Sequence, residues 1–417
     1  MKIRLILYIF LVLFVISCTK EDIQVQSLSL SSSALYLKVG ETASLMLTVD
    51  PANASASGTR WVSRDEDVAT VNSSGDVIGV ALGETYIVVL SPDESVKDSC
   101  EVYVNGILAG DSGNETITMG QGYANDIYYS MANGVVATVP RANWDIAFET
   151  GSRTSTIIIN AGTGVKLYTY PNGDISAWSS MDITGIENWK EMNNSDTTWS
   201  FGAFERNALG HPDYGWGIYN SVTHDVVSDS LFVLQLPDQS YKKLWIIKKA
   251  SVDNEYIFEI ANIDGTGDVT DTVNCEPYVS KNFIYYSVTS GTVIDREPDT
   301  DSWDFVVTRY IEMIPDGTGG LVPYPVIGVL TNTGVKSATL ENVPFSTTDY
   351  SSAVFVTSIS EIGSDWKSFN MDTYQYSVDE NKVYFVKDRD LSVYRIVFTA
   401  FEGSSTGLIG FDKTKLN

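Results

Sequence analysis

The stretch Trp144-Asp145-Ile146-Ala147-Phe148 decides how most of this chain is built, because it returns downstream as Trp303-Asp304-Phe305-Val306-Val307. The markers around it return in the same order: Tyr128-Tyr129-Ser130 with Tyr285-Tyr286-Ser287, Gly134 with Gly291, Thr163-Gly164-Val165-Lys166 with Thr333-Gly334-Val335-Lys336, Ile186–Lys190 with Ile362–Lys367, and Leu231-Phe232-Val233-Leu234 with Val383-Tyr384-Phe385-Val386. Recurrence in a fixed order is typical of an internal duplication. The sequence therefore predicts two copies of one supersecondary block.

The segments between these markers have strand patterns. Leu231–Leu236 and Leu244–Ile247 flank the turn Pro237-Asp238-Gln239-Ser240, which predicts a hairpin, and Glu255–Ile260 follows as a third strand. Helical turns are expected at Ile186–Lys190 and Ser360–Lys367. We predict an all-β protein, in which residues 117–417 form a mostly antiparallel domain of two similar halves.

Residues 27–105 contain short alternating strand patterns and a tryptophan, which predicts a small β-sandwich. The segment resembles the bacterial Ig-like domain of group 2. The resemblance rests on Val39-Gly40-Glu41-Thr42, Val49-Asp50-Pro51, Trp61-Val62-Ser63, Val68-Ala69-Thr70-Val71, Gly75-Asp76-Val77-Ile78-Gly79 and Gly83-Glu84-Thr85. It implies a spacer on a surface protein, with adhesion as the alternative. Residues 106–116, rich in Gly, Asn and Ser, predict a linker.

Residues 1–18 have the pattern of a secretory signal peptide. Lys2 and Arg4 frame the start of an apolar run, Leu5–Ile16, that is shorter than the about 20 residues of a membrane-spanning helix. Cys18 at the cleavage point resembles the lipidated cysteine of bacterial lipoproteins, and Lys20-Glu21-Asp22 resembles a surface-export signal. We therefore expect a lipid anchor at Cys18, a tether at 19–26, and a place on the outer membrane, exposed at the cell surface.

The chain carries 53 acidic and 27 basic residues, a net charge of -26, which argues against nucleic acid as a partner. Cys100 and Cys275 are expected to be buried thiols rather than a disulfide. The histidines do not form a zinc-protease motif, and neither a nucleophile elbow nor a phosphate-binding loop is present. We therefore expect that the protein is not an enzyme.

A second resemblance covers about residues 115–417. Trp144–Phe148, Arg153, the strand Ile157-Ile158-Ile159-Asn160, Tyr241-Lys242-Lys243-Leu244 and the strand around Phe258 are similar to the HmuY-like haem-binding lipoproteins. This resemblance implies a β-rich, lipid-anchored protein that holds haem iron between two His or Met side chains. It also implies transfer of the haem to an outer-membrane partner, a TonB-dependent transporter.

The first half carries about 25 extra residues between Met192 and Trp216, and long insertions in compact domains are usually functional. If the resemblance holds, His224 is the first candidate for the haem iron, followed by Met192, His211 and Met181. The expected pocket lining is Trp199, Phe201, Phe204, Tyr214, Trp216 and Tyr219.

Other interpretations stay open. The histidines could be structural, and the aromatic side chains could simply hold the insertion down. Arg153 or Arg309 paired with Asp145 or Asp304 is favoured over arginine bound to haem propionates. The alternative functions are a surface adhesion protein for glycans or host polypeptides, and a structural lipoprotein of a membrane complex.

Overall fold

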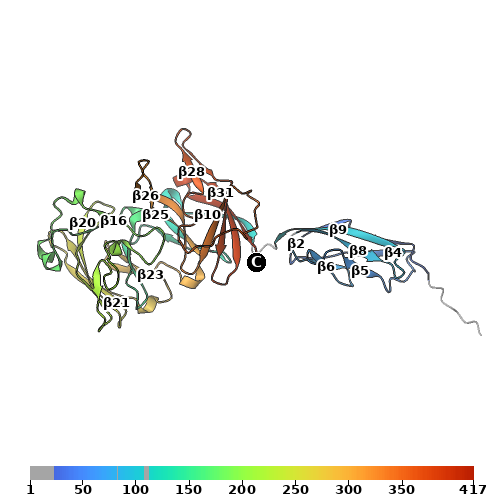
Figure 1. Cartoon of the computed structure of the whole chain (residues 1–417), viewed down its shortest axis with the longest axis horizontal. Coiled ribbons are helices and arrows are strands. Elements are labelled where there is room, and N and C mark those ends of the chain that lie inside the picture. The colour runs from blue at the N-terminus through green and yellow to red at the C-terminus, as the bar shows by residue number, and fades with distance from the viewer. Residues whose placement is uncertain (1–22, 82, 108–111) are drawn as a thin grey trace, which may run out of the picture. The chain divides into compact units, whose positions relative to one another are not determined.

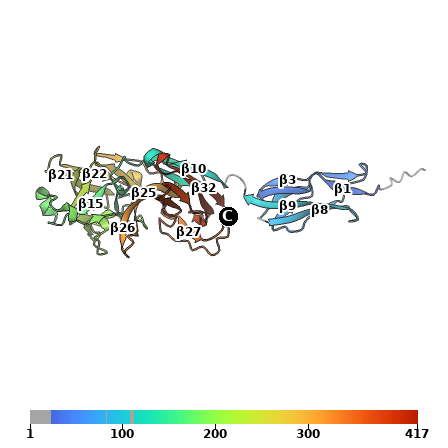
Figure 2. The same ribbon diagram turned by 90° about the horizontal axis from the view of Figure 1, so that it is seen from above.

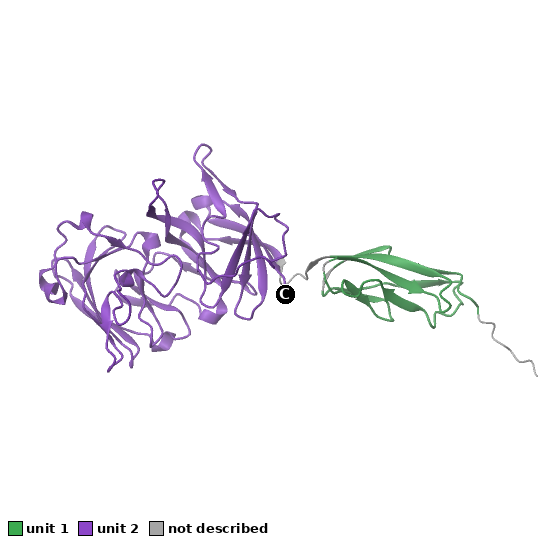
Figure 3. Cartoon of the chain, in the orientation of Figure 1, with its two compact units in different colours: residues 1–109 green, residues 110–417 purple. Residues whose placement is uncertain are grey.

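The computed structural model describes residues 23–81, 83–107 and 112–417, and the chain divides into two compact units, residues 1–109 and 110–417 (Figure 3). The expected signal peptide, the lipidation site Cys18 and the first part of the tether lie outside the described residues, as do residues 108–111 of the expected linker. Within the described ranges, no helix is long and apolar enough to cross a membrane.

The first unit is a β-sandwich, as predicted. One sheet has the order β2-β9-β8-β5, and the remaining strands pair as β3-β7-β6 and β1-β4. Inward-facing side chains such as Leu37, Val77, Ile87 and Val102 fill its core, together with the free thiol of Cys100. The strands are β1 (Ser27–Leu30), β2 (Ala34–Val39), β3 (Thr42–Ser44), β4 (Leu47–Asp50), β5 (Arg60–Ser63), β6 (Ala69–Val71), β7 (Asp76–Gly79), β8 (Gly83–Leu90) and β9 (Lys97–Ile107).

The second unit is also built from strands, and its two repeats follow one another along the chain. The first repeat contains β10 (Ser112–Thr118), β11 (Asn125–Ser130), β12 (Gly134–Pro140), β13 (Ile146–Glu149), β14 (Ile157–Ile159), β15 (Lys166–Thr169), β16 (Glu191–Met192), β17 (Gly217–Tyr219), β18 (Val226–Ser228), β19 (Phe232–Gln235), β20 (Tyr241–Ala250) and β21 (Glu255–Asn262). The second contains β22 (Val269–Asn274), β23 (Phe283–Ser287), β24 (Thr292–Ile294), β25 (Phe305–Pro315), β26 (Leu321–Thr331), β27 (Lys336–Glu341), β28 (Lys367–Asn370), β29 (Gln375–Val378), β30 (Lys382–Lys387), β31 (Val393–Phe401) and β32 (Leu408–Lys415).

Helical structure in the described part of the chain is limited to short 3-10 turns. These are η1 (Gln121–Tyr123), η2 (Ala161–Thr163), η3 (Ile175–Ser180), η4 (Ile186–Asn188), η5 (Ala203–Glu205), η6 (Glu276–Tyr278), η7 (Thr300–Ser302) and η8 (Gly403–Ser405). The turn expected near Ile186 is therefore present. The one expected at Ser360–Lys367 is wrong, because this segment is irregular and leads into β28.

The two repeats exchange their first strands. Strand β11 of the first repeat pairs with β25 of the second, and β23 of the second pairs with β13 of the first. Strand β10 likewise joins β32, and β22 joins β21. Each half of the unit is thus a pair of sheets assembled from both repeats: β14-β13-β23-β24 with the sheet around β19-β20-β21-β22, and β12-β11-β25-β26 with β10-β32-β31-β30-β27. In two perpendicular views β25 lies between the strands of the two halves (Figures 1 and 2).

Each half has its own core. Phe148, Leu234, Phe258 and Tyr286 are buried in the first half, and Tyr129, Phe305, Trp366 and Phe411 are buried in the second. The clusters contain tyrosines from the repeated Tyr-Tyr-Ser marker, and in each half that tyrosine comes from the other repeat. The duplicated sequence therefore does build two similar halves, but neither half is made from one repeat alone.

The Trp-Asp marker forms the joint of the exchange. The Asp145 carboxylate accepts the backbone N–H of Val288, at 2.7 Å, in the turn after β23. The Asp304 carboxylate accepts that of Met131, at 2.6 Å, in the turn after β11. Burial raises the pKa of both carboxyl groups. Each aspartate thus fixes the hairpin that the opposite repeat inserts.

Neighbouring contacts repeat in the same way. The Asn160 amide donates to the carbonyl oxygen of Trp144, and Asn332 donates to that of Trp303. The ring of Trp144 meets that of Tyr285 edge to face, with ring centroids 4.8 Å apart. Trp303 meets Tyr128 in the same way, at 4.9 Å. These matched contacts explain why the sequence markers recur as a set.

The boundary between the units differs from the expected one. Residues 112–116, predicted as part of the linker, belong to β10, which pairs with β32 over its whole length. The second domain therefore begins before residue 117, because the last strand of the chain takes its neighbour from the segment that we assigned to the linker.

Candidate functional site

The insertion of the first half is anchored in the core beneath it. Trp216 is fully buried, and its indole N–H donates to the Ser155 carbonyl oxygen at 3.1 Å. Phe204 packs against Phe232 with ring centroids 4.8 Å apart. Both were expected to line a pocket, and both are instead core side chains that hold the insertion in place.

The insertion also covers the open edge of β14. The Glu205 carboxylate accepts the N–H of Ile157 at 3.0 Å, while the Asn194 side chain accepts the N–H of Ile159 and donates to its carbonyl oxygen. Burial raises the pKa of Glu205 well above its usual range. Side chains here take the place of a neighbouring strand, which fixes the course of the insertion.

Both histidines of the chain lie at one cavity of about 600 Å³ beside this insertion. Its walls come from the β13–β14 connection, the insertion, the β17–β18 turn and the β20–β21 turn. The lining residues are Ser152, Arg153, Thr154, Ser155, His211, Tyr214, Tyr219, His224, Val226, Ser251 and Val252. The volume falls within the range of about 300–1,000 Å³ that is usual for small-molecule sites.

Tyr219 lies between the two histidines. Its hydroxyl is 2.6 Å from Nδ1 of His224, and its ring centroid is 5.1 Å from that of His211. The ring of Tyr219 thus contacts both imidazoles, and both histidines are exposed. When Nδ1 of His224 donates to the Tyr219 oxygen, Nε2 keeps a free lone pair and can bind a metal.

The backbone at His224 is held in an uncommon conformation. Its φ of 65° lies in the left-handed region, which costs a non-glycine residue about 1 kcal/mol or more. The His224 N–H donates to the Asn220 carbonyl oxygen. The Ser251 hydroxyl donates to the His224 carbonyl oxygen at 2.6 Å. These contacts fix the start of the side chain at the cavity rim.

The other predicted site residues lie elsewhere. Met192 is 2 % exposed and sits in the core of the first half, opposite Leu167 of β15, so it does not face His224 across the cavity. Met181 is buried in a different cluster. Phe201 lies under the Arg206 guanidinium, and Trp199 donates to the Thr331 carbonyl oxygen between the two halves. Of the expected set, the structure brings together His211, His224, Tyr214 and Tyr219.

The expected arginine–aspartate pairs are not formed. Arg153 is exposed and lines the histidine cavity, and Arg309 is half-buried and lines a different one. Asp145 and Asp304 accept backbone N–H groups instead, and the arginine nearest Asp304 is Arg389, at 3.9 Å. The predicted pairing of Arg153 with a buried aspartate is therefore wrong. The position of Arg153 in the turn with Ser152, beyond the end of β13, is the signal for an exposed residue.

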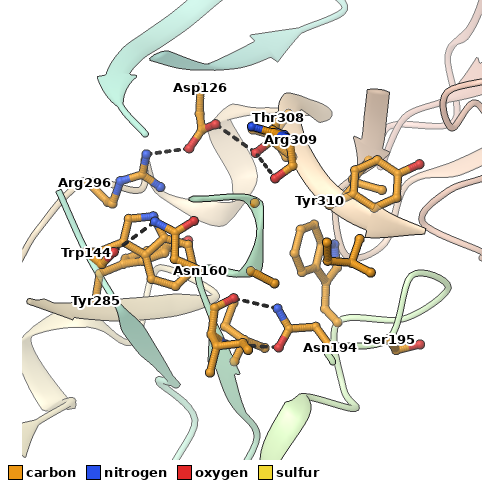
Figure 4. A pocket seen from close by; sticks show the side chains of 18 of the residues that line it. Asp126, Trp144, Asn160, Asn194, Ser195, Tyr285, Arg296, Thr308, Arg309 and Tyr310 are labelled. Atoms are coloured by element: carbon orange, nitrogen blue, oxygen red, sulfur yellow. Dashed lines mark hydrogen bonds and ion pairs between the residues drawn. The ribbon is translucent and has the colours of Figure 1, made fainter. Parts of the chain in front are cut away.

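A second cavity, of about 80 Å³, lies between the two halves (Figure 4). It shares no lining residue with the histidine cavity. Arg296 and Asp126 form an ion pair of 2.7 Å at its wall, and both side chains are almost fully buried. Its volume is too small for a porphyrin, so the larger cavity is the candidate site for haem.

Comparison with known families matches the first unit. The family model of the bacterial Ig-like domain (group 2) covers residues 24–102, which confirms the resemblance stated for residues 27–105. No curated protein matches the chain.

Two solved structures from Bacteroides resemble part of the chain. A protein of Bacteroides fragilis assigned as a lipoprotein is 16 % identical, with a TM-score of 0.18, over 31 % of this chain and 80 % of its own. A protein of Bacteroides vulgatus assigned as HmuY-like and haem-binding is 18 % identical, with a TM-score of 0.17, over 35 % of this chain and 79 % of its own. Domains 4–9 of the surface-layer protein SbsC are 12 % identical, with a TM-score of 0.18, over 90 % and 64 %. Similarities at this level carry no argument about function.

Proposed function

We propose that this chain is a non-enzymatic surface lipoprotein that binds haem and passes it to a TonB-dependent transporter of the outer membrane. The observation that carries the proposal is that the only two histidines of the sequence, His211 and His224, line one cavity of about 600 Å³. The lipid anchor and the transfer step rest on the sequence resemblance, and the cavity supports the binding step.

The chemistry of the cavity suits haem. Imidazole nitrogen is a common axial ligand of haem iron, and tyrosinate is another. The rings of Tyr214 and Tyr219 offer apolar faces to the macrocycle. Arg153, whose guanidinium has no hydrogen bond or ion pair among the described residues, can pair with a haem propionate. The cavity thus offers an imidazole ligand for the iron, aromatic faces for the macrocycle and a guanidinium for a propionate.

The test is a titration of the lipid-free protein with ferric haem, followed in the Soret band. We expect a saturable one-to-one shift in the wild type. We expect His224→Ala and His211→Ala each to weaken binding by about tenfold or more, which is ~1.4 kcal/mol.

Tyr374→Phe, which alters an exposed tyrosine of the second half, is the matched control and should bind as the wild type does. A titration in which the spectrum never departs from that of free haem contradicts haem binding. Binding that survives the double variant His211→Ala/His224→Ala contradicts the site.

Transfer has its own test. Deleting the gene should slow growth when haem is the iron source, and the wild-type chain should restore growth, whereas His224→Ala should not. Equal growth of the deletion strain on haem contradicts the transfer step without bearing on the binding step.

One observation favours the alternative, a surface protein that binds glycans or host polypeptides. The hairpin β28–β29 extends from the second half (Figure 1) and carries aromatic side chains that are open to solvent. Tyr374 is 76 % exposed, and the ring of Phe369 packs at a tilt against that of Tyr376, with ring centroids 4.8 Å apart. Affinity electrophoresis in polysaccharide gels tests it: Tyr374→Ala with Phe369→Ala should abolish retardation, and His224→Ala should not.

A further inference from the structure

The cavity between the two halves has the features of a second binding site. It lies where the exchanged strands meet, because Tyr128 comes from β11 of the first repeat and Tyr285 from β23 of the second, and their hydroxyls are 3.4 Å apart. Figure 4 shows Trp144, Arg296 and Asp126 on one side of it and Asn194 and Ser195 on another. The site therefore exists only when both repeats are folded together.

The ionised side chains that line this cavity leave an excess of positive charge. Asp126 is already neutralised by Arg296, and it also accepts the Thr308 hydroxyl at 2.8 Å. Arg309 is the further charged residue in the lining, and no hydrogen bond or ion pair to its guanidinium is present in the part of the chain that the structure describes. A chain with a net charge of -26 thus places an uncompensated cation at an internal cavity.

Three buried donors at the cavity have no partner within the described residues. These are Nε of Arg296, the indole N–H of Trp144 and the hydroxyl of Tyr310, on residues that are 7 %, 8 % and 9 % exposed. Buried donors are almost always hydrogen-bonded, and an unpaired one is costly. Arg296 cannot turn freely to find a partner, since its guanidinium is held 5.1 Å from the Tyr285 ring and 5.8 Å from the Trp144 ring. The donors are therefore fixed before any ligand arrives.

Apolar side chains form part of the remaining walls, beside the polar Asn194 and Ser195, and the space is small. Ile158, Val306, Leu330 and Trp199 line it. A volume of about 80 Å³ restricts the cavity to small ligands. An anion with two oxygens satisfies paired N–H donors and a guanidinium best, and the apolar walls favour a hydrocarbon body.

We propose that this cavity binds a small organic carboxylate with an apolar body, through the N–H groups of Arg296 and Trp144 and the guanidinium of Arg309. The site is independent of the histidine cavity, so the two proposals stand or fall separately.

The test is isothermal titration of the whole protein with acetate, isobutyrate and benzoate, and with benzamide as the neutral counterpart of benzoate. We expect one-to-one binding of isobutyrate or benzoate with a Kd below about 1 mM, and acetate and benzamide weaker by about tenfold or more. Arg309→Gln should weaken the favoured carboxylate by about tenfold. Because Arg309 is half-buried at the cavity rather than in the core, the variant is expected to fold.

Arg64→Gln is the matched control, since Arg64 is an exposed arginine of the first unit that lines neither cavity, and it should leave carboxylate binding unchanged. If none of the three carboxylates binds saturably, water alone fills the cavity and the proposal is overturned. Equal binding of benzamide, or carboxylate binding that is insensitive to Arg309→Gln, overturns it as well. Thermal unfolding of Arg309→Gln, compared with the wild type, separates loss of the site from loss of the fold.

Discussion

The buried carboxylates of Asp145 and Asp304 accept equivalent hydrogen bonds in the two halves, and removing either should destabilise the hairpin that it fixes. Asp145→Ala leaves the N–H of Val288 without its acceptor, and Asp304→Ala does so for Met131. A lost hydrogen bond of this kind costs about 1–3 kcal/mol. We expect each variant to lower the free energy of unfolding by that amount in urea titrations followed by tryptophan fluorescence.

Asp253→Ala is the control for this pair, because Asp253 is exposed in the β20–β21 turn. It should change the unfolding free energy by less than about 0.5 kcal/mol. If Asp145→Ala and Asp304→Ala are no more costly than this control, the carboxylates do not fix the exchanged hairpins.

Glu297 should make stability fall as the pH rises. Burial raises its pKa to about 7 from 4.5, even though the Tyr285 hydroxyl donates to it at 2.5 Å. Between these two values the folded state holds a proton that the unfolded state has released, so the free energy of unfolding decreases with pH, by about 3 kcal/mol at most.

The variant Glu297→Gln removes this titration. We expect the free energy of unfolding of the variant, minus that of the wild type, to be larger at pH 8 than at pH 5. Urea titrations at the two pH values measure this difference. An equal difference at both pH values contradicts the assignment to Glu297.

At this scale, the sequence predicts some site residues and not others. His211 and His224 are candidates because they are the only histidines, one within the insertion and one just after it, and the structure does bring them to one cavity. Met192 and Trp216 have the same apolar character as wall residues, and only burial shows that they are core. Composition near an insertion cannot separate a wall from an anchor, because both are aromatic or aliphatic.

Among the elements, strand β14 shows how an open sheet edge is closed without another strand. The Asn194 side chain bonds both polar groups of Ile159 and also accepts the N–H of Ala203. Asn194→Ala should therefore lower the free energy of unfolding by about 2 kcal/mol and raise amide exchange at Ile159.

Asn193→Ala, one residue away, is the control, and it should leave exchange at Ile159 unchanged. In the second half, the backbone of residues 359–363 covers the equivalent edge, with Val329 and Thr331 as its partners. If Asn194→Ala leaves the exchange of Ile159 as slow as in the wild type, the side chain is not what closes this edge.

Hairpins were the most predictable elements, because both strands and their turn are contiguous. Strands β19 and β20 lie within a residue or two of the predicted Leu231–Leu236 and near Leu244–Ile247. The partner of β11 was not predictable in the same way. Alternation of apolar residues shows that a strand has a buried face, but it does not show which of two similar strands lies beside it.

At the scale of the whole molecule, the exchange predicts which half fails when a segment is removed. Deleting residues 112–141 takes away β10, β11 and β12, which belong to the sheets of the second half. We expect hydrogen–deuterium exchange to rise in β25 and β32, far along the chain, and to rise much less in β13 and β20, which follow the deletion directly.

The reciprocal deletion, residues 269–294 with β22, β23 and β24, is the matched comparison. It should expose β13 and β21 and spare β25. If each deletion instead unfolds the repeat in which it lies, the two repeats fold without exchanging strands.

The duplication itself could be read from the sequence, and the all-β architecture with it. The exchange could not, since the markers occur in the same order whether each repeat closes on itself or on its neighbour. That choice depends on contacts between residues more than 100 positions apart, such as Asp145 with Val288.

The strands that the two repeats trade are held in one chain by the short connection of residues 263–268. Two separate chains that traded strands in this way would come apart on dilution. Joined as they are, each repeat meets its partner at an effective concentration of about 1 mM, however dilute the protein becomes. A single chain can thus keep its two repeats paired, and with them the cavity between its halves, without association with a second copy.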